Sequence, residues 1–297
     1  MEKVIIIGAG PAGISAALYA VRGNLDPLVI NNGIGALEKA EKIENYYGLE
    51  HPLSGKELYD TGITQAKALG VRILDAQVLG VGGFDTFVVK TTEGEFETQS
   101  LILATGSKRA APKIPGVKEF EGKGVSYCAI CDAFFYRGKD VAVLGNGDFA
   151  MHEAKELSNT ASTVTIYTNG EEPEFTPEGN ISVNTMKIQS VEGDDLVSGI
   201  RLAPDVQAQE INAEAGQQAN DFCPAEGVFI AMGTAGSTEI ARQMGAELTE
   251  KGNIKVNENM ETTIPGLYAA GDCTGGLLQV AKAVYEGAQA GIHAGKY

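Results

Sequence analysis

The 297-residue chain contains no tryptophan, only three histidines and four cysteines, and it is poor in basic residues. Its 23 Lys and Arg against 39 Asp and Glu give a net charge of −16. This charge argues against a nucleic-acid or anionic-membrane partner, because phosphate binding requires a basic surface. The sequence shows no apolar run of about 18 residues and no signal peptide, so no membrane association is expected.

Four cysteines in a chain of this length do not make a disulfide framework. We therefore expect a cytoplasmic protein, in which a close cysteine pair is more often catalytic or metal-binding than structural. Glycine, by contrast, is abundant, with 38 residues. Many tight turns and close backbone approaches are expected.

A complete GxGxxG motif, Gly8–Gly13, follows a continuously apolar strand at residues 3–7 and opens a helix that we place from about Ile14 to Arg22. Gly8 allows the tight turn, Gly10 lets the backbone approach a pyrophosphate, and Gly13 lets helix and strand pack closely. The helix N-terminus then offers free N–H groups to phosphates. The next strand, at 28–30, ends in Asn31-Asn32 and lacks the usual acid for a ribose hydroxyl, which disfavours NAD at this site.

A second, weaker copy, GxGxxA at Gly145–Ala150, lies between a strand at 141–144 and a helix at 148–158, followed by a strand at 163–167. This motif predicts a nucleotide-binding fold, but by itself it does not decide whether a dinucleotide binds there. Residues 168–174 contain no Lys or Arg for a 2′-phosphate and include three acids. A ribose contact by Glu171 or Glu172 is one interpretation, and a solvated acidic loop is the favoured one.

The rest of the chain continues in the α/β style. We expect a helix at 53–69 with Ser54 as its N-cap, and strands at 71–74, 78–81, 86–91, 95–98 and 101–104. Further β segments are expected at 181–191, 197–203, 227–232 and 266–270, an exposed loop at 204–221, and a terminal helix from about Leu277. Two connectors, 106–116 and 233–237, enclose the second βαβ unit. The prediction is two Rossmann-like three-layer α/β domains, the second (112–237) inserted into the first (1–111 and 238–297).

Cys128-Ala129-Ile130-Cys131-Asp132 forms one CxxC motif. A zinc site normally needs two further ligands at motif spacing, and neither the isolated Cys223 and Cys273 nor the scattered histidines supply them. No metal site is expected. A redox disulfide is the favoured interpretation, with Asp132 as a proton donor or acceptor, or as a helix cap.

Taken together, these motifs resemble the low-molecular-weight thioredoxin reductase family of flavoproteins over nearly the whole chain. The CxxC is followed by Phe134-Phe135-Tyr136, as in that family, and precedes the second nucleotide fold. The residues that match its FAD site are Gly8, Gly10, Pro11, Ala12 and Gly13; Asn45 of the pair Glu44-Asn45; Ala104, Thr105 and Gly106; Gly271 and Asp272 at the end of the segment 263–272; and Gln279.

The resemblance implies FAD as cofactor, thioredoxin as partner and a homodimer. It implies that Cys131 faces the flavin, that Cys128 attacks the partner disulfide, and that Asp132 is the acid/base. A CxxC in the inserted domain cannot readily face the flavin and a bulky partner at once. The segments 107–116 and 233–237 are therefore expected to act as hinges for a domain rotation.

One departure from the family concerns the electron donor. NADPH-using members carry His-Arg-Arg-x-x-x-Arg after the second βαβ strand, whereas this chain has Thr168-Asn169-Gly170 and then Glu174. This combination resembles the ferredoxin-dependent flavin thioredoxin reductases. An acidic ferredoxin is expected to dock near Lys108, Arg109 and Lys113, in the one strongly basic stretch of an acidic chain.

Three other functions remain open at this point. One is a thioredoxin reductase that uses NADH, or NADPH weakly, which bleaching of the flavin by either nucleotide would reveal. Another is an FAD dithiol oxidase with O2 as acceptor, which would consume oxygen in the presence of a dithiol. The last is a flavin-binding redox sensor without turnover.

Overall fold

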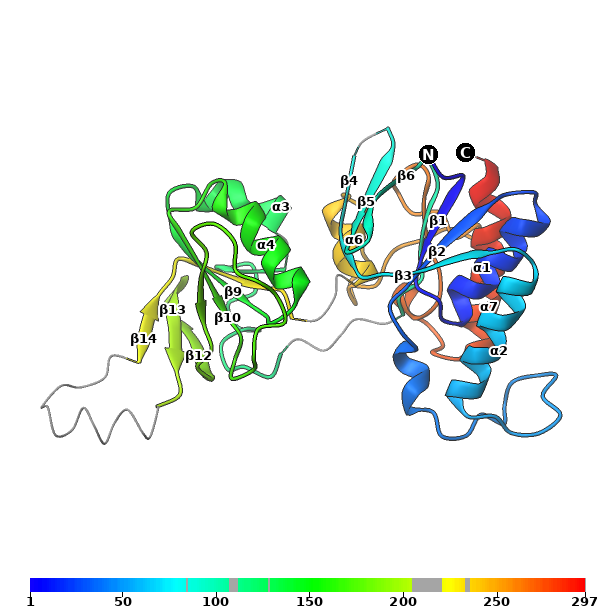
Figure 1. Ribbon diagram of the computed structural model, residues 1–297, viewed down its shortest axis with the longest axis horizontal. Coiled ribbons are helices and arrows are strands. Elements are labelled where there is room, and N and C mark those ends of the chain that lie inside the picture. The colour runs from blue at the N-terminus through cyan, green and yellow to red at the C-terminus, as the bar shows by residue number, and fades with distance from the viewer. Residues whose placement is uncertain (84, 107–111, 128, 205–220, 233–235, 297) are drawn as a thin grey trace, which may run out of the picture. The chain divides into compact units, whose positions relative to one another are not determined.

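Two compact units make up the chain (Figure 1). The first consists of Met1–Arg109 and Ala235–Tyr297, and the second consists of Ala110–Thr234, which lies between those two segments in the sequence. The computed structural model describes residues 1–83, 85–106, 112–127, 129–204, 221–232 and 236–296, with the backbone alone for Ile130 and Cys131. Each unit has its own parallel sheet and its own core. The predicted α/β class, with one Rossmann-like domain inserted in another, is confirmed.

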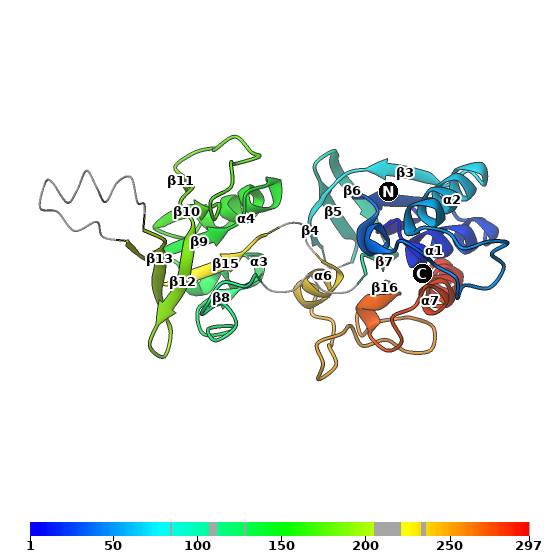
Figure 2. The ribbon, with the colours of Figure 1, turned by 90° about the horizontal axis from the view of Figure 1, so that it is seen from below.

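The first unit is built on a parallel five-stranded sheet in the order β16-β7-β1-β2-β3. These strands are β1 (Val4–Ile7), β2 (Pro27–Asn31), β3 (Arg72–Asp75), β7 (Leu101–Leu103) and β16 (Leu267–Ala269). β1 is buried at every residue, as a central parallel strand covered on both faces must be. Helices α1 (Pro11–Arg22), α2 (Gly55–Ala68) and α7 (Val280–His293) lie on one side of this sheet. The antiparallel sheet of β4 (Val78–Gly82), β5 (Phe87–Thr91) and β6 (Gly94–Thr98) lies on the other (Figures 1 and 2).

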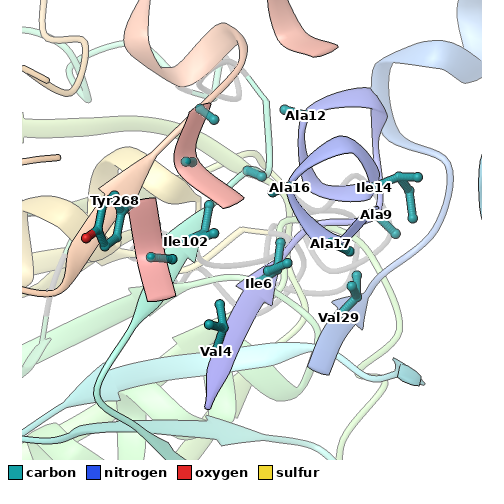
Figure 3. Packing of buried hydrophobic residues seen from close by; sticks show 14 of the residues in the cluster. Val4, Ile6, Ala9, Ala12, Ile14, Ala16, Ala17, Val29, Ile102 and Tyr268 are labelled. Carbon is teal, nitrogen blue, oxygen red and sulfur yellow. The ribbon is translucent and has the colours of Figure 1, made fainter. Parts of the chain in front are cut away.

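Small residues let α1 and α7 approach closely. Figure 3 shows Ala12 and Ala16 on α1 beside the β1 and β7 side chains Ile6 and Ile102. The contact with α7 is made at backbone distance: a Cβ added to Gly287 would lie 2.1 Å from the Ala12 carbonyl oxygen. One turn further on, a Cβ on Gly291 would lie 2.2 Å from the Ala16 carbonyl oxygen. Glycine is therefore required at both positions for this helix pair.

The second unit repeats the architecture with the strand order β11-β10-β9-β15-β8, again all parallel. Its strands are β8 (Val125–Ser126), β9 (Asp140–Leu144), β10 (Thr163–Tyr167), β11 (Ser182–Asn184) and β15 (Gly227–Ile230). Helices α3 (Ala129–Asp132) and α4 (Asp148–Ser158) lie on one side of it. A three-stranded antiparallel sheet of β12 (Ile188–Gly193), β13 (Val197–Leu202) and β14 (Phe222–Pro224) lies on the other (Figure 2).

The N-cap expected at Ser54 is confirmed, and Glu57 completes it as a capping box. The Ser54 hydroxyl accepts a hydrogen bond from the Glu57 N–H at 3.2 Å, and the Glu57 carboxylate accepts one from the Ser54 N–H at 2.8 Å. These reciprocal bonds satisfy two backbone donors at the start of α2. No helix in the described part of the chain is long and apolar enough to cross a membrane.

Several boundaries differ from those predicted. The segment 181–191 is two strands in different sheets, because the chain leaves β11 and re-pairs with β13. The glycine turn runs straight into α1 at Pro11, because proline is well suited to the first helical position. The sequence predicts that Ser237 ends a connector and the inserted domain. In the structure it begins α6 (Ser237–Gln243) in the first unit. Residues 107–111 and 233–235 of the predicted hinge segments, and residues 205–220 of the predicted loop, fall outside the described residues.

The α1–α7 contact gives a first prediction. Gly287→Ala is expected to lower the free energy of unfolding by roughly 1–3 kcal/mol, because the added methyl group collides with the backbone of α1. Gly62→Ala in α2 is the matched control. A Cβ there meets nothing closer than the Ile14 side chain at 3.6 Å, and the change should stabilise by about 0.5–1 kcal/mol. Denaturant unfolding of both variants measures the difference, and equal effects would contradict the packing argument.

Candidate functional site

Three motifs that lie far apart in the sequence meet at the carboxyl edge of the first sheet. The Ala104 N–H donates to the Ile7 carbonyl at 2.8 Å, and the Ala270 N–H donates to the Leu103 carbonyl at 3.0 Å. Gly8, with a φ of 109°, passes so close to this junction that a Cβ on it would lie 2.4 Å from the Ala104 oxygen. The order of the strands reverses between β7 and β1, and ligands of open α/β sheets bind in the crevice at such a point.

The N-terminus of α1 is free to receive an anion. Gly10 caps the helix without a side-chain hydrogen bond, Pro11 is its first residue, and its first turn holds no acidic residue. A Cβ on Gly10 would meet nothing within 4 Å, whereas one on Gly13 would lie 1.8 Å from the Gly8 oxygen. Gly13 is thus needed for the turn itself and Gly10 leaves open space beside it. This arrangement fits the pyrophosphate of a dinucleotide such as FAD.

Two residues predicted to lie along the flavin are joined directly. The Asn45 side-chain amide donates to the Gln279 side-chain oxygen at 2.9 Å across 234 residues of sequence. Gln279 is also the N-cap residue of α7, so the loop that carries Asn45 is tied to the start of that helix. The neighbouring Glu44 instead pairs with Lys42 at 2.9 Å in solvent.

The turn at Gly271 and Asp272 is held by a part-buried ion pair that sequence analysis missed. Lys282 and Glu286, one turn apart on α7, pair at 2.9 Å with side chains only 15% and 12% exposed. The Lys282 ammonium donates to the Gly271 carbonyl at 2.7 Å, and the Glu286 carboxylate accepts the Gly271 N–H at 2.9 Å. Thr274 donates to the same carboxylate and accepts from Lys282. The only signal in the sequence was a Lys–Glu pair at i,i+4 spacing.

Asp272 follows this network directly. Desolvation is the largest influence on its carboxyl and raises the pKa above the ordinary value. The positive charge of Lys282 acts in the opposite direction, and the negative charge of Glu286 adds to the rise. The ion pair therefore determines both the position of the turn and the charge environment of Asp272.

Ser237 is a second residue that sequence analysis missed. The hydroxyl groups of Thr105 and Ser237 lie 2.7 Å apart, and each also accepts the other's backbone N–H, at 2.9 and 3.1 Å. This reciprocal bonding fixes the strand end Ala104–Gly106 to the start of α6. Gly106 then takes a left-handed conformation, with a φ of 87°.

The second glycine turn approaches a neighbouring strand as closely as the first does, but acidic residues lie beside it. Gly145 approaches β15 as Gly8 approaches β7, with a Cβ position 2.3 Å from the Ala231 oxygen. Helix α4 carries Asp148 in its first turn, where α1 has no acid. The Glu174 N–H donates to the Asn146 carbonyl at 2.7 Å, and Glu174 Oε2 lies 3.9 Å from a Cβ position on Gly147. A carboxylate thus stands beside the turn where a phosphate would bind.

The redox motif lies at the start of α3. Cys128 is outside the described residues, and Cys131 is described as backbone in that helix. Asp132, the predicted acid/base, accepts a hydrogen bond from the Ser126 hydroxyl at 2.6 Å. Phe134 and Phe135 follow with 73% and 69% of their surfaces exposed, which is unusual for large apolar side chains.

The remaining cysteines are not part of the CxxC motif. Cys273 is buried, and desolvation raises the pKa of its thiol to about 12, so it stays protonated. Cys223 is a free thiol on β14. No group of His, Cys, Asp and Glu able to hold a metal ion occurs among the residues that the structure describes.

Comparison with known proteins places this geometry among flavin disulfide reductases. Residues 2–287 match the pyridine nucleotide-disulphide oxidoreductase family. Thioredoxin reductase of Aquifex aeolicus is 37% identical over 284 residues, covering 91% of this chain and 84% of that protein.

Two solved structures extend this similarity to the fold. The atypical thioredoxin reductase TRi from Desulfovibrio vulgaris Hildenborough has a TM-score of 0.87 and 39% identity, with 99% of this chain and 97% of that one covered. A ferredoxin-flavin thioredoxin reductase from Clostridium acetobutylicum has a TM-score of 0.69 and 30% identity, with 99% and 96% covered.

The Lys282–Glu286 ion pair gives a second prediction. Lys282→Met leaves the part-buried Glu286 carboxylate without its cationic partner and should lower the free energy of unfolding by roughly 1–3 kcal/mol. The dissociation constant for FAD should rise as well, because the Gly271 turn loses its anchor. Lys56→Met, which breaks an exposed i,i+4 pair with Asp60 on α2, should leave both quantities unchanged. Denaturant unfolding and fluorescence titration with FAD measure the two effects, and similar results for both variants would refute the role of Lys282.

Proposed function

Because the chain belongs to the pyridine nucleotide-disulphide oxidoreductase family, we propose that it is a thioredoxin reductase that takes its electrons from reduced ferredoxin and not from NADPH. This family and the thioredoxin reductases within it are FAD flavoproteins, so the predicted cofactor is confirmed. Thioredoxin reductase activity is supported by relatives that match nearly the whole chain. The identity of the donor is our inference, and it rests on the second glycine turn.

The observation that carries this inference is the position of Glu174. Asn169 and Gly170 both adopt left-handed backbone conformations, with φ of 56° and 89°, and turn the chain back after β10. The backbone of Glu174 then bonds to the glycine turn, and its carboxylate lies beside Gly147. Each arginine–phosphate contact is worth about 1.5–3 kcal/mol, so replacing such contacts with a carboxylate costs several orders of magnitude in affinity.

The contrast between the two turns supports the same conclusion. Both have a glycine N-cap and no capping side chain, so both helices leave N–H groups free. Only the second has acids beside it: Asp148 in the first turn of α4, and Glu174, whose carboxylate lies near Gly147. An otherwise equivalent fold with reversed local charge favours a scaffold that has kept its shape without binding NADPH.

Within this proposal the cysteines transfer the reducing equivalents. Two electrons and two protons convert the Cys128–Cys131 disulfide into two thiols. The Cys128 thiolate attacks the thioredoxin disulfide, and Cys131 then displaces reduced thioredoxin from the mixed disulfide and restores the original bond. Asp132 holds the exchanged proton, with Ser126 as its hydrogen-bond donor. Bound FAD supplies the link between a one-electron donor and this two-electron chemistry.

A local basic surface is proposed to dock ferredoxin on this acidic chain. Lys113, Lys118, Lys123 and Arg137 are exposed side chains of the second unit, whereas Lys108 and Arg109 lie outside the described residues. Arg137 lies 6.0 Å from the centre of the exposed Phe134 ring. Charge of this sign near the dithiol steers an acidic partner despite the net charge of −16. The thioredoxin reaction requires a reducing compartment, and we place it in the cytoplasm.

The exposed apolar side chains of α7 are the proposed homodimer contact. Tyr285 and Ile292, two turns apart on the same face of α7, are 60% and 46% exposed. Leu277 and Leu278, just before the helix, are 67% and 56% exposed. Apolar groups gathered on one helix of a protein rich in surface charge favour burial against a second copy.

A spectral titration tests the donor. Under anaerobic conditions NADPH and NADH are expected to leave the flavin band unchanged, reduced ferredoxin to bleach it, and oxidised thioredoxin to restore it. The ferredoxin rate should fall as salt is raised, because steering by surface charge is screened. Micromolar bleaching by either nucleotide would contradict the proposal, and oxygen consumption with a dithiol would indicate the oxidase.

The Glu174→Arg variant makes the titration specific to the proposed cause. Removing the carboxylate and adding a phosphate contact should let NADPH bleach the flavin at a lower concentration than in the parent. Glu172→Arg makes the same charge change two residues away on an exposed side chain and should have no such effect.

Sedimentation velocity tests the dimer. Tyr285→Glu should convert the protein to a monomer, because a carboxylate would be buried unpaired in the contact. Leu69→Glu changes another exposed apolar residue, at the end of α2, and should leave a dimer. A monomeric parent protein would rule out the dimer altogether.

A further inference from the structure

Glu153 on α4 is the one charged side chain that the structure buries completely among the residues it describes, with 2% of its surface exposed. Its Oε2 atom accepts a hydrogen bond from the backbone N–H of Ala129 at 2.6 Å. Its Oε1 atom is also buried and has no hydrogen-bond partner within the described part of the chain. Burying a half-satisfied carboxylate costs stability, and buried titratable groups of this kind are enriched at functional sites.

Ala129 connects this carboxylate to the redox motif. It is the residue that follows Cys128, and it is the first residue of α3, the helical turn whose backbone includes Cys131. Helix α4 packs against α3, so the bond joins two neighbouring elements of the second unit. The Glu153 carboxylate therefore holds the start of the short segment that carries both cysteines.

Burial is the main influence on the pKa of the Glu153 carboxyl. Desolvation raises the pKa of its carboxyl to about 7, the bond from Ala129 acts in the opposite direction, and the negative charge of Glu156 adds to the rise. The other titratable groups on the elements packed against α4 have partners of their own. Asp132 on α3 is bonded to Ser126, Asp140 on β9 to Thr163, and Tyr167 on β10 to the Cys223 thiol.

We propose that Glu153 is a positioning residue of the dithiol centre, which anchors the start of α3 through the Ala129 N–H and couples the reactivity of the cysteines to its own protonation. The inference rests on the proposed thiol–disulfide function. The ionised carboxylate is the stronger acceptor for the N–H, and we expect its negative charge to oppose formation of a thiolate in the segment that Ala129 begins. Protonation weakens the anchor and removes that opposing charge.

The sign of the effect follows from the chemistry of reduction. When the Cys128–Cys131 bond breaks, two electrons enter the two sulfur atoms, which then take up protons from solvent according to their pKa values. Glu153 is not consumed in this step. Its ionisation as the pH rises through about 7 raises the thiol pKa, so the reactivity of the thiols increases less steeply with pH than that of an isolated thiol.

Two substitutions separate anchoring from charge. Glu153→Gln keeps an oxygen acceptor for the Ala129 N–H and removes the titration, whereas Glu153→Leu removes both. The control is Glu178→Gln. It removes an exposed carboxylate that pairs with Lys155, a residue of α4 like Glu153. All variants are prepared with FAD bound, and their FAD content and far-UV circular dichroism are compared with the parent protein.

Hydrogen exchange at the Ala129 amide and the pH profile of iodoacetamide alkylation of the reduced protein are then measured. Loss of a hydrogen bond to a charged group is worth at least about 1.5 kcal/mol, so exchange should accelerate about tenfold in Glu153→Leu. Glu153→Gln should accelerate exchange less than Glu153→Leu does, because a neutral amide oxygen still accepts the bond, although more weakly than a carboxylate. The parent and Glu178→Gln profiles should show an inflection near pH 7 that both Glu153 variants lack.

Each outcome bears on a distinct claim. Suppose that the Cys128–Cys131 disulfide is reducible. Unchanged hydrogen exchange at Ala129 in Glu153→Leu, or an alkylation profile of the Glu153 variants identical to that of the parent, then overturns this inference alone. The same conclusion follows if Glu178→Gln matches the Glu153 variants. Absence of a reducible disulfide overturns the proposed function and this inference with it. Should Glu153→Leu fail to fold, the loss of the inflection in Glu153→Gln still decides the coupling.

Discussion

The close approach of α1 to its neighbours is the constraint on which the first unit depends. At Gly13 the helix meets the Gly8 carbonyl, and at Gly287 and Gly291 helix α7 meets the carbonyls of α1. No other residue type leaves room at these distances. Because the contacts are made by backbone, α1 has one position on the sheet, and its free N-terminus is fixed at the carboxyl edge beside Ala104 and Gly271. The dinucleotide site follows from this packing.

The same turn occurs twice, and charge separates its two copies. Sheet order and glycine geometry are alike in both units, so shape alone predicts a nucleotide at each. Near α1 the structure places a neutral turn, whereas near α4 it places Asp148 and Glu174. Acidic side chains repel a phosphate, whereas the free N–H groups at the start of a helix attract one, so the two turns differ in local charge although their folds are alike.

Removing charged side chains from water lowers stability unless partners compensate for the lost hydration, and Lys282, Glu286 and Glu153 show both situations. The Lys282–Glu286 pair has hydrogen bonds on both partners and holds the turn of Asp272, so its burial is compensated. Glu153 has only one of its oxygen atoms satisfied and sits against the redox segment. The two acids therefore differ: Glu286 is ion-paired and holds the Gly271 turn, whereas Glu153 is fully buried with one oxygen atom unsatisfied.

The sequence by itself determined the local features: the strand–glycine–helix turns at Gly8 and Gly145, the N-cap at Ser54, the CxxC, and the acids at 171–174. Each depends on residues within a few positions of one another, where turn and cap chemistry act. Only the tertiary structure decided which distant groups meet. The bond from Asn45 to Gln279, the pairing of Thr105 with Ser237, and the contact of Glu153 with Ala129 join residues 24 to 234 positions apart. Such contacts carry no local pattern, because they arise from how helices and strand ends pack rather than from which residues follow one another.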